Sequence, residues 1–108
     1  MGLSGGQLVV EMLKAYGVRY LFGVPGDTSL PFYDALGQAQ AQGEIIHVLA
    51  HDERSATYMA DVYARVSSRP GVTEAPSGAG ATYLAAALAE PYASSIPVIA
   101  LTSDTPLS

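Results

Sequence analysis

The chain has 108 residues, of which ten are acidic and five are basic, and its formal net charge is −5. This length fits one domain spanning residues 1–108, and an apolar fraction of 49% is sufficient for a packed core. The acidic balance argues against nucleic acid as a partner, and the lack of cysteine excludes disulfide scaffolds and thiolate metal sites.

The sequence shows no membrane or secretion signal. Its longest apolar runs are far shorter than a membrane span, and no cluster of Lys and Arg marks an anionic membrane surface. The N-terminal residues lead directly into a helical pattern instead of a signal peptide. We therefore expect no membrane partner and a cytoplasmic location.

The first helix is predicted to begin at Ser4, because Ser4 and Gln7 have the spacing of a capping box. Gly17 occupies the usual position just after a helix end. Between them, apolar residues recur at helical spacing: Leu8, Val9, Met12, Leu13 and Tyr16. Residues 18–24 then predict a short buried strand.

A second helix follows the glycine-rich loop 23–26. Asp27, Thr28 or Ser29 can cap this helix, and Pro31 is tolerated in its first turn. Gly43 ends it, and residues 44–50 predict the second strand.

The third helix is predicted over residues 52–66. Its alanines recur every four residues, at Ala56, Ala60 and Ala64, so another element can approach this face closely. Residues 71–75 predict the third strand. A loop at 76–80, a fourth helix closed by Pro91 and a strand over 96–102 complete the pattern.

Strands that alternate with helices predict an α/β fold with a parallel sheet and helices on both faces. In such sheets, ligands bind outside the carboxyl ends of the strands. Glu53 lies at a helix start just after a strand, and the loops Gly23 to Asp27 and Pro76 to Gly80 are expected to reach the same edge.

Each of these features also has a purely structural interpretation. Glycines after strands serve tight turns, and neither loop completes a dinucleotide or P-loop fingerprint. Glu53 also fits the role of a first-turn carboxylate that favours the helix dipole. His47 and His51 lack a further ligand at metal-binding spacing, so no metal site is predicted, and Ser77 lacks the flanking pattern of a nucleophile elbow.

Taken together, three segments resemble the pyrimidine-binding domain of thiamine-diphosphate enzymes, in the same order. They are YLFGVPG at 20–26, HDERSA with MADxYAR within 51–65, and RPGV followed by SGAGAT within 69–82. Residues 94–102 also resemble the fourth strand of that domain. The resemblance is closest to the acetolactate synthase and 2-oxo-acid decarboxylase group.

This resemblance implies a three-layer α/β/α arrangement with strand order 2-1-3-4, an incomplete thiamine-diphosphate-binding fold. It also implies that thiamine diphosphate is the cofactor and that Glu53 hydrogen-bonds N1′ of its aminopyrimidine, activating it for 2-oxo-acid chemistry. Pro25 and Gly26 match the loop that lines the pyrimidine.

Some residues depart from the family pattern. Pro76 and Ala79 match wall positions where synthases have Thr and Pro, and Tyr83 stands where Asn is usual. Glu74 stands where the family prefers an apolar residue, and we expect it at an exposed strand end.

In this family a separate domain holds the diphosphate and Mg²⁺ through a Gly-Asp-Gly…Asn motif, which this sequence lacks. The diphosphate-binding domain of a parent enzyme is therefore the expected partner. The family domain continues beyond the equivalent of Ser108, so the resemblance implies a truncated or engineered piece with an open sheet edge. Because such edges self-associate, we expect a homo-oligomer with little or no catalysis of its own.

Three functions remain open from the sequence. The first is the pyrimidine-binding portion of a thiamine-diphosphate lyase or transferase, which forms or breaks C–C bonds of 2-oxo acids. The second is a non-catalytic folding or oligomerisation module derived from such an enzyme. The third is a Rossmann-like nucleotide binder, which the incomplete fingerprint disfavours.

Overall fold

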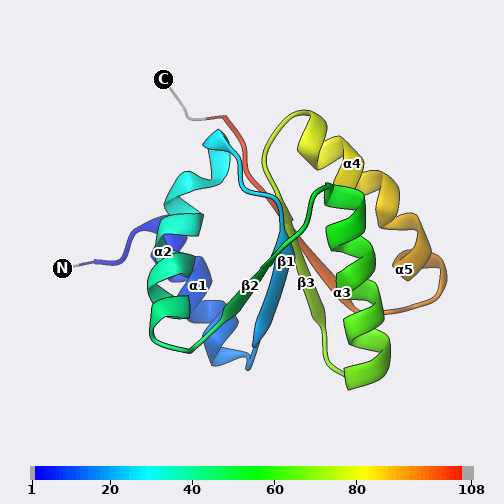
Figure 1. The fold of residues 1–108 in the computed structure, drawn as a ribbon, viewed down its shortest axis with the longest axis horizontal. Coiled ribbons are helices and arrows are strands. Elements are labelled where there is room, and N and C mark those ends of the chain that lie inside the picture. Colours follow the sequence, from blue (N-terminus) through cyan, green and yellow to red (C-terminus); the bar gives the residue numbers. More distant parts are fainter. Residues whose placement is uncertain (1, 106–108) are drawn as a thin grey trace.

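The structure, a computed structural model, describes residues 2–105 and has three layers (Figure 1). A parallel sheet lies in the middle, with strand order β2-β1-β3-β4, which confirms the predicted order. The strands are β1 (Tyr20–Gly23), β2 (Ile46–Leu49), β3 (Gly71–Ala75) and β4 (Val98–Thr102).

Helices cover both faces of the sheet, as expected (Figure 1). On one side lie α1 (Gly5–Ala15) and α2 (Leu30–Ala41), the latter preceded by the short 3₁₀ turn η1 (Asp27–Ser29). On the other side lie α3 (Glu53–Ser67), α4 (Ala79–Ala87) and α5 (Ala89–Ala93). No helix among residues 2–105 is long and apolar enough to cross a membrane.

The main core lies between the sheet and the α1/α2 layer. Its most buried side chains are Leu21, Leu36, Ile45 and Val72, each at most 1% exposed. Of the apolar stripe predicted for α1 only Leu13 is buried. The other buried residue of α1 is Val10, which lies outside that stripe, and Leu8, Val9, Met12 and Tyr16 are 37–80% exposed.

The predicted capping box of α1 is confirmed. Ser4 Oγ accepts from the Gln7 amide at 3.2 Å, and Gln7 Oε1 accepts from the Ser4 amide at 2.8 Å. At the other end, Gly17 has φ 79°, and the Val18 amide donates to the Leu13 carbonyl at 3.0 Å. Because the Val18 amide is used in this bond at the helix end, Val18 does not pair in the sheet, and β1 begins later than predicted.

The alanine face of α3 packs closely on the sheet, as its spacing indicated. Ala56 and Ala60 are fully buried and Ala64 is 4% exposed. A Cβ atom on Gly71 would overlap the Ala60 carbonyl, so the first residue of β3 touches the helix backbone.

The predicted end of the fourth helix is wrong. Pro91 does not close that helix but lies buried within α5, which follows α4 after a single intervening residue. Pro91 occupies the first turn of α5, where a missing N–H costs no intrahelical hydrogen bond.

Candidate functional site

Two loops and the start of α3 meet at the carboxyl end of the sheet. A Cβ atom on Gly26 would lie 2.6 Å from Pro76 Cβ, so these loops touch. A Cβ atom on Gly80 would lie 3.0 Å from Glu53 Oε1 and 2.9 Å from Pro76 Cδ. Gly26, Glu53, Pro76 and Gly80 therefore form one cluster, called the rim cluster below.

A direct hydrogen bond also joins the two loops. The amide of Ser77 donates to Oγ1 of Thr28 at 2.9 Å, although the two residues are 49 positions apart. This bond fixes the loop after β3 against the η1 turn after β1. The sequence analysis did not identify it, because a hydroxyl in a turn has many local partners.

Local bonds fix the backbone of the first turn of α3, in which Glu53 lies. Asp52 caps α3 by accepting from the Arg54 amide at 2.7 Å, which places Glu53 in the first turn. Thr57 Oγ1 donates to the Glu53 carbonyl at 2.9 Å and lies 3.4 Å from Thr73 Oγ1 of β3. The first turn of α3 is thus attached to the sheet.

Asp52 and Arg54 form a paired ion contact beside the rim cluster. The two nitrogens of Arg54 reach the two carboxylate oxygens of Asp52 at 2.9 and 2.8 Å. The guanidinium lowers the pKa of Asp52 to about 2. Arg54 also lies 5.2 Å above the ring of Tyr83, and this cation–π contact connects α3 to α4.

The structure places all the sequence-predicted site residues at this end of the sheet, but it brings only some into contact. Gly26, Glu53 and Pro76 meet in the rim cluster. Pro25 lies exposed in the loop after β1, Ala79 is the exposed first residue of α4, and Tyr83 is exposed on the second turn of that helix. Among residues 2–105, no group of three or more acidic or histidine side chains could hold a metal ion.

The expectation for Glu74 is wrong. Glu74 is 2% exposed, because it lies at the interior of β3 on the α1/α2 side of the sheet. The phenol of Tyr33 donates to its Oε2 at 2.6 Å. Burial raises the pKa of Glu74 to about 7, a rise that the Tyr33 and Ser29 hydroxyls oppose and the Glu53 charge reinforces.

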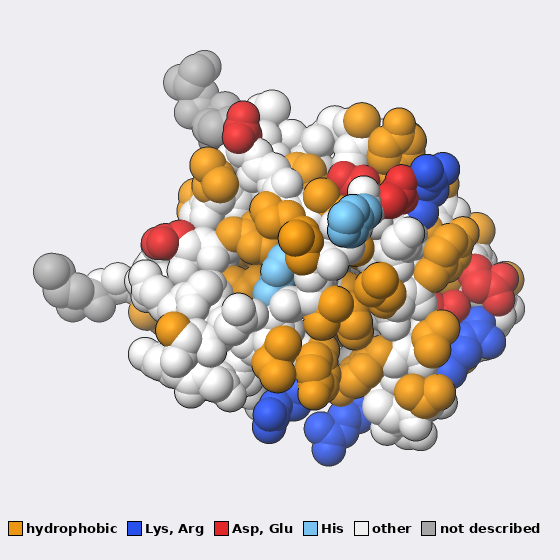
Figure 2. Space-filling view, in the orientation of Figure 1, with side chains coloured by type: hydrophobic (Ala, Val, Ile, Leu, Met, Phe, Trp, Pro, Cys, Tyr) orange, Lys and Arg blue, Asp and Glu red, His pale blue; other side chains and the backbone are white. Residues whose placement is uncertain are grey.

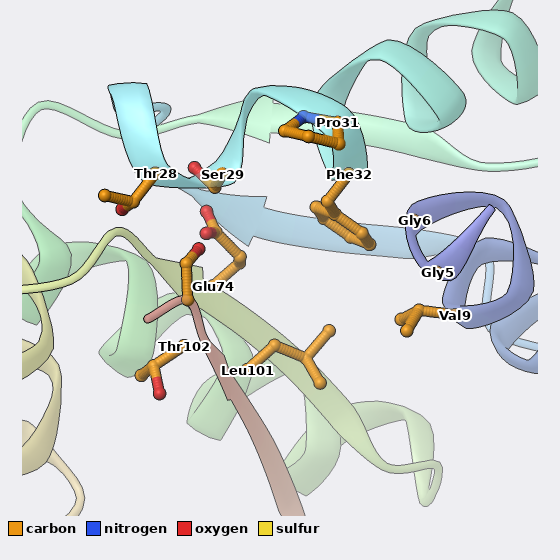
Figure 3. Close-up of a pocket in the computed structure, with 11 residues that line it drawn as sticks. Gly5, Gly6, Val9, Thr28, Ser29, Pro31, Phe32, Glu74, Leu101 and Thr102 are labelled. Carbon is orange, nitrogen blue, oxygen red and sulfur yellow. The ribbon is translucent and has the colours of Figure 1, made fainter. Parts of the chain in front are cut away.

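Glu74 lines a cavity of about 260 Å³ between α1, η1, α2 and β4 (Figure 3). A charged residue inside the run Val-Thr-Glu-Ala was the only sequence signal for this feature. Tyr33, its partner, is one of seven tyrosines and had no distinguishing pattern. The sequence analysis therefore missed this buried pair.

The rim cluster can present a carboxylate to a flat, polar ring. Glycine at position 26 and at position 80, in the first turn of α4, allows the Pro76 ring to pack closely against both backbones, and Pro76 gives the cluster an apolar wall. Glu53 stands at a helix N-terminus, where negative charge is favoured. Such an arrangement can accept a hydrogen bond from a protonated ring nitrogen, or share a proton with it.

Comparison with known proteins identifies the family of the chain. The family model described as "Thiamine pyrophosphate enzyme, N-terminal TPP binding domain" matches residues 3–108. An acetolactate synthase of Arthrospira platensis is 42% identical over 106 residues, which are 98% of this chain and 18% of that protein.

Two further relatives have the same percentage identity to this chain. A probable acetolactate synthase large subunit of Methanocaldococcus jannaschii is 42% identical over 96% of this chain, and a probable 2-ketoarginine decarboxylase of Pseudomonas aeruginosa is 42% identical over 94%. The chain spans about 17% of the length of each. The chain belongs to the thiamine pyrophosphate enzyme family and corresponds to its N-terminal TPP-binding domain.

Proposed function

We propose that the chain is the pyrimidine-binding portion of a thiamine-diphosphate enzyme that acts on 2-oxo acids, and that Glu53 holds N1′ of the aminopyrimidine. The observation that carries this proposal is the direction of the Glu53 carboxylate, toward Gly80 at the carboxyl edge of the sheet. The relatives of the chain are named as acetolactate synthases and a 2-ketoarginine decarboxylase, and both names fit chemistry on 2-oxo acids.

The residues present fit an aminopyrimidine. Glu53 is only partly buried, and its carboxylate has no hydrogen-bond partner within residues 2–105, so it is available to a ligand. Because residue 80 is glycine, the Glu53 carboxylate can lie directly against its backbone, and a Cβ atom there, 3.0 Å from Glu53 Oε1, would push the carboxylate away. Pro76 adds an apolar surface on which a ring can lie.

Thiamine diphosphate, when bound, supplies the carbanion chemistry that 2-oxo-acid conversion requires. The Glu53 carboxyl group would share a proton with N1′ and would thereby fix the protonation state of the ring. Gly26 and Pro76 would exclude water from one side of the pyrimidine. Pro25, Ala79 and Tyr83 would line the outer wall and influence which 2-oxo acid fits.

The chain would need a second domain for the diphosphate and its Mg²⁺, since its own sequence has no motif for them. We propose the diphosphate-binding domain of a parent enzyme as that partner. The alternative function, a folding or oligomerisation module, would retain the fold without binding the cofactor.

We also propose that the chain self-associates through an apolar surface on α3. Figure 2 shows hydrophobic side chains gathered over the face that β2 and α3 share. Tyr58, Met59 and Val62 are 40–56% exposed, and together with Phe22 they line a shallow hollow. We call these four residues the α3 surface. Exposed apolar groups gathered in this way mark interaction sites.

Calorimetric titration tests the cofactor proposal. Thiamine diphosphate with Mg²⁺ is added to the chain together with a separately produced diphosphate-binding domain. We expect Glu53→Gln to weaken binding by roughly 10- to 100-fold, because a hydrogen bond to a charged group contributes about 1.5–3 kcal/mol. The control Asp34→Asn removes an exposed carboxylate on α2 and should leave affinity unchanged.

The outcomes separate the candidate functions. Equal affinity for the wild type and Glu53→Gln would contradict the role of Glu53. A lack of binding by both, with the diphosphate-binding domain present, would favour the non-catalytic module. A preference for NAD or ATP would favour the nucleotide binder.

A further inference from the structure

One oxygen of the buried Glu74 carboxylate has no partner. Tyr33 satisfies Oε2, but Oε1 has no hydrogen-bond partner within residues 2–105. The hydroxyl of Ser29 lies close enough to oppose the rise in the Glu74 pKa, but in the structure it donates to the Gly26 carbonyl at 3.1 Å. Buried polar atoms are almost always hydrogen-bonded, so this oxygen, beside a cavity, can accept a hydrogen bond from a donor that enters the cavity.

The cavity beside Glu74 has one polar end and one apolar end. In Figure 3 the carboxylate lies near Ser29, whereas Val9, Phe32 and Leu101 lie toward the other end. None of its lining residues has a positively charged side chain. At about 260 Å³, the cavity is slightly smaller than the roughly 300 Å³ at which drug-sized sites begin. It therefore suits a molecule of a few carbons.

The charges around Glu74 favour a cation at the polar end. The ionisable groups that face it are the Tyr33 phenol on α2 and the Glu53 carboxylate on α3. The residues of α1 and β4 that line the cavity are not ionisable. Burial raises the pKa of Glu74 to about 7, which means that ionising this carboxyl group inside the protein is unfavourable. A positively charged hydrogen-bond donor beside it would make ionisation less unfavourable.

We propose that this cavity is a second binding site, which takes a small alkylammonium ion. The ammonium group donates to Oε1 of Glu74, and the alkyl chain lies on Val9, Phe32 and Leu101. The site is on the α1/α2 side of the sheet, whereas Glu53 begins a helix on the opposite side. Binding there does not require the thiamine cofactor.

The test is a titration of the 108-residue chain with n-butylammonium chloride at about pH 8, where Glu74 is mostly ionised. Sodium chloride at the same ionic strength is the baseline, and chemical shifts of backbone amides are the readout. We expect saturable shifts around the cavity. Glu74→Gln should weaken binding by at least about tenfold, and Asp34→Asn should not change it.

Two further arms examine the chemistry of the ligand. 1-Butanol has a similar alkyl chain without the charge, and butyrate has the opposite charge, which the nearby start of α1 would favour. We expect neither to bind comparably. We also expect n-butylammonium binding to weaken at about pH 5, where Glu74 is protonated.

The proposal is overturned if n-butylammonium gives no saturable shift, if Glu74→Gln binds it equally, or if butanol or butyrate binds as well. Should Glu74→Gln fail to fold, Val9→Phe decides the question, because it fills the cavity and keeps the carboxylate. Unchanged binding by Val9→Phe would contradict the site. Because no thiamine diphosphate is present, these outcomes are independent of those for Glu53.

Discussion

Two glutamates near the same end of the sheet have opposite surroundings, and these surroundings separate their roles. Glu53 is partly exposed at a helix start, with its carboxylate directed at a glycine. Glu74 is buried on the other side of the sheet, and a tyrosine holds one of its oxygens. Glu53 is accessible to an aminopyrimidine ring bound between the two loops. Glu74 affects the stability of the fold and sets the charge of the adjacent cavity.

Glu74 should make stability fall as pH rises. Its pKa is about 7 in the folded chain against 4.5 as the ordinary value, so the folded state binds more protons than the unfolded state between these limits. The favourable contribution is fully present below about pH 4.5 and is lost as pH rises through 7.

We expect Glu74→Gln to remove this dependence. Relative to the wild type, the variant should gain stability from about pH 4 to about pH 8, by up to about 3 kcal/mol. Urea unfolding of both proteins across that range measures the difference, which cancels contributions from other titrating groups. A difference in unfolding free energy that does not vary with pH would contradict the burial of Glu74.

At the scale of elements, α3 and β3 are the pair that positions the site. The alanine face of α3 lies on β3 with no space at Gly71, and Thr57 bonds the first turn of α3 to Thr73 in the middle of β3. The position of the Glu53 backbone therefore depends on how closely α3 approaches the sheet.

We expect Gly71→Ala to destabilise the chain by about 1–3 kcal/mol or more, because the new methyl group overlaps the Ala60 carbonyl. The control is Gly37→Ala in α2, where a Cβ atom meets nothing within 4 Å. That change should stabilise the helix by about 0.5–1 kcal/mol. Chemical denaturation measures both, and a neutral Gly71→Ala would contradict the close packing.

The elements predicted correctly are those that local patterns specify. The capping box at Ser4 and the alanine row of α3 depend on residues a few positions apart, and both are present in the structure. The bond from Ser77 to Thr28 joins distant parts of the chain, so local spacing contained no signal for it. The pairing of Glu74 with Tyr33 is likewise long-range, and Glu74 was wrongly expected to be exposed.

For the molecule as a whole, the rim cluster and the α3 surface are separate features. The first lies at the carboxyl edge of the sheet, and the second lies where α3 meets the sheet beside Phe22 of β1. Self-association through the α3 surface would leave the loops 23–27 and 76–80 open to a partner domain.

We expect Val62→Asp to convert an oligomeric chain to a monomer, because it places a charge within the α3 surface. Tyr92→Asp is the matched control, since Tyr92 is 88% exposed on α5 and lies outside that surface. Sedimentation velocity distinguishes the states. A wild-type chain that sediments as a monomer at high concentration would contradict the proposed self-association.

The most direct test of the cofactor site is to map where thiamine diphosphate binds. The chain is labelled with ¹⁵N, an unlabelled diphosphate-binding domain is added first, and thiamine diphosphate with Mg²⁺ follows. We predict that this last addition shifts the amides of Gly26, Glu53 and Gly80 most strongly, and that Glu53→Gln reduces the shifts. Shifts confined to other parts of the chain, or none at saturating cofactor, would contradict the assignment of the rim cluster as the cofactor site.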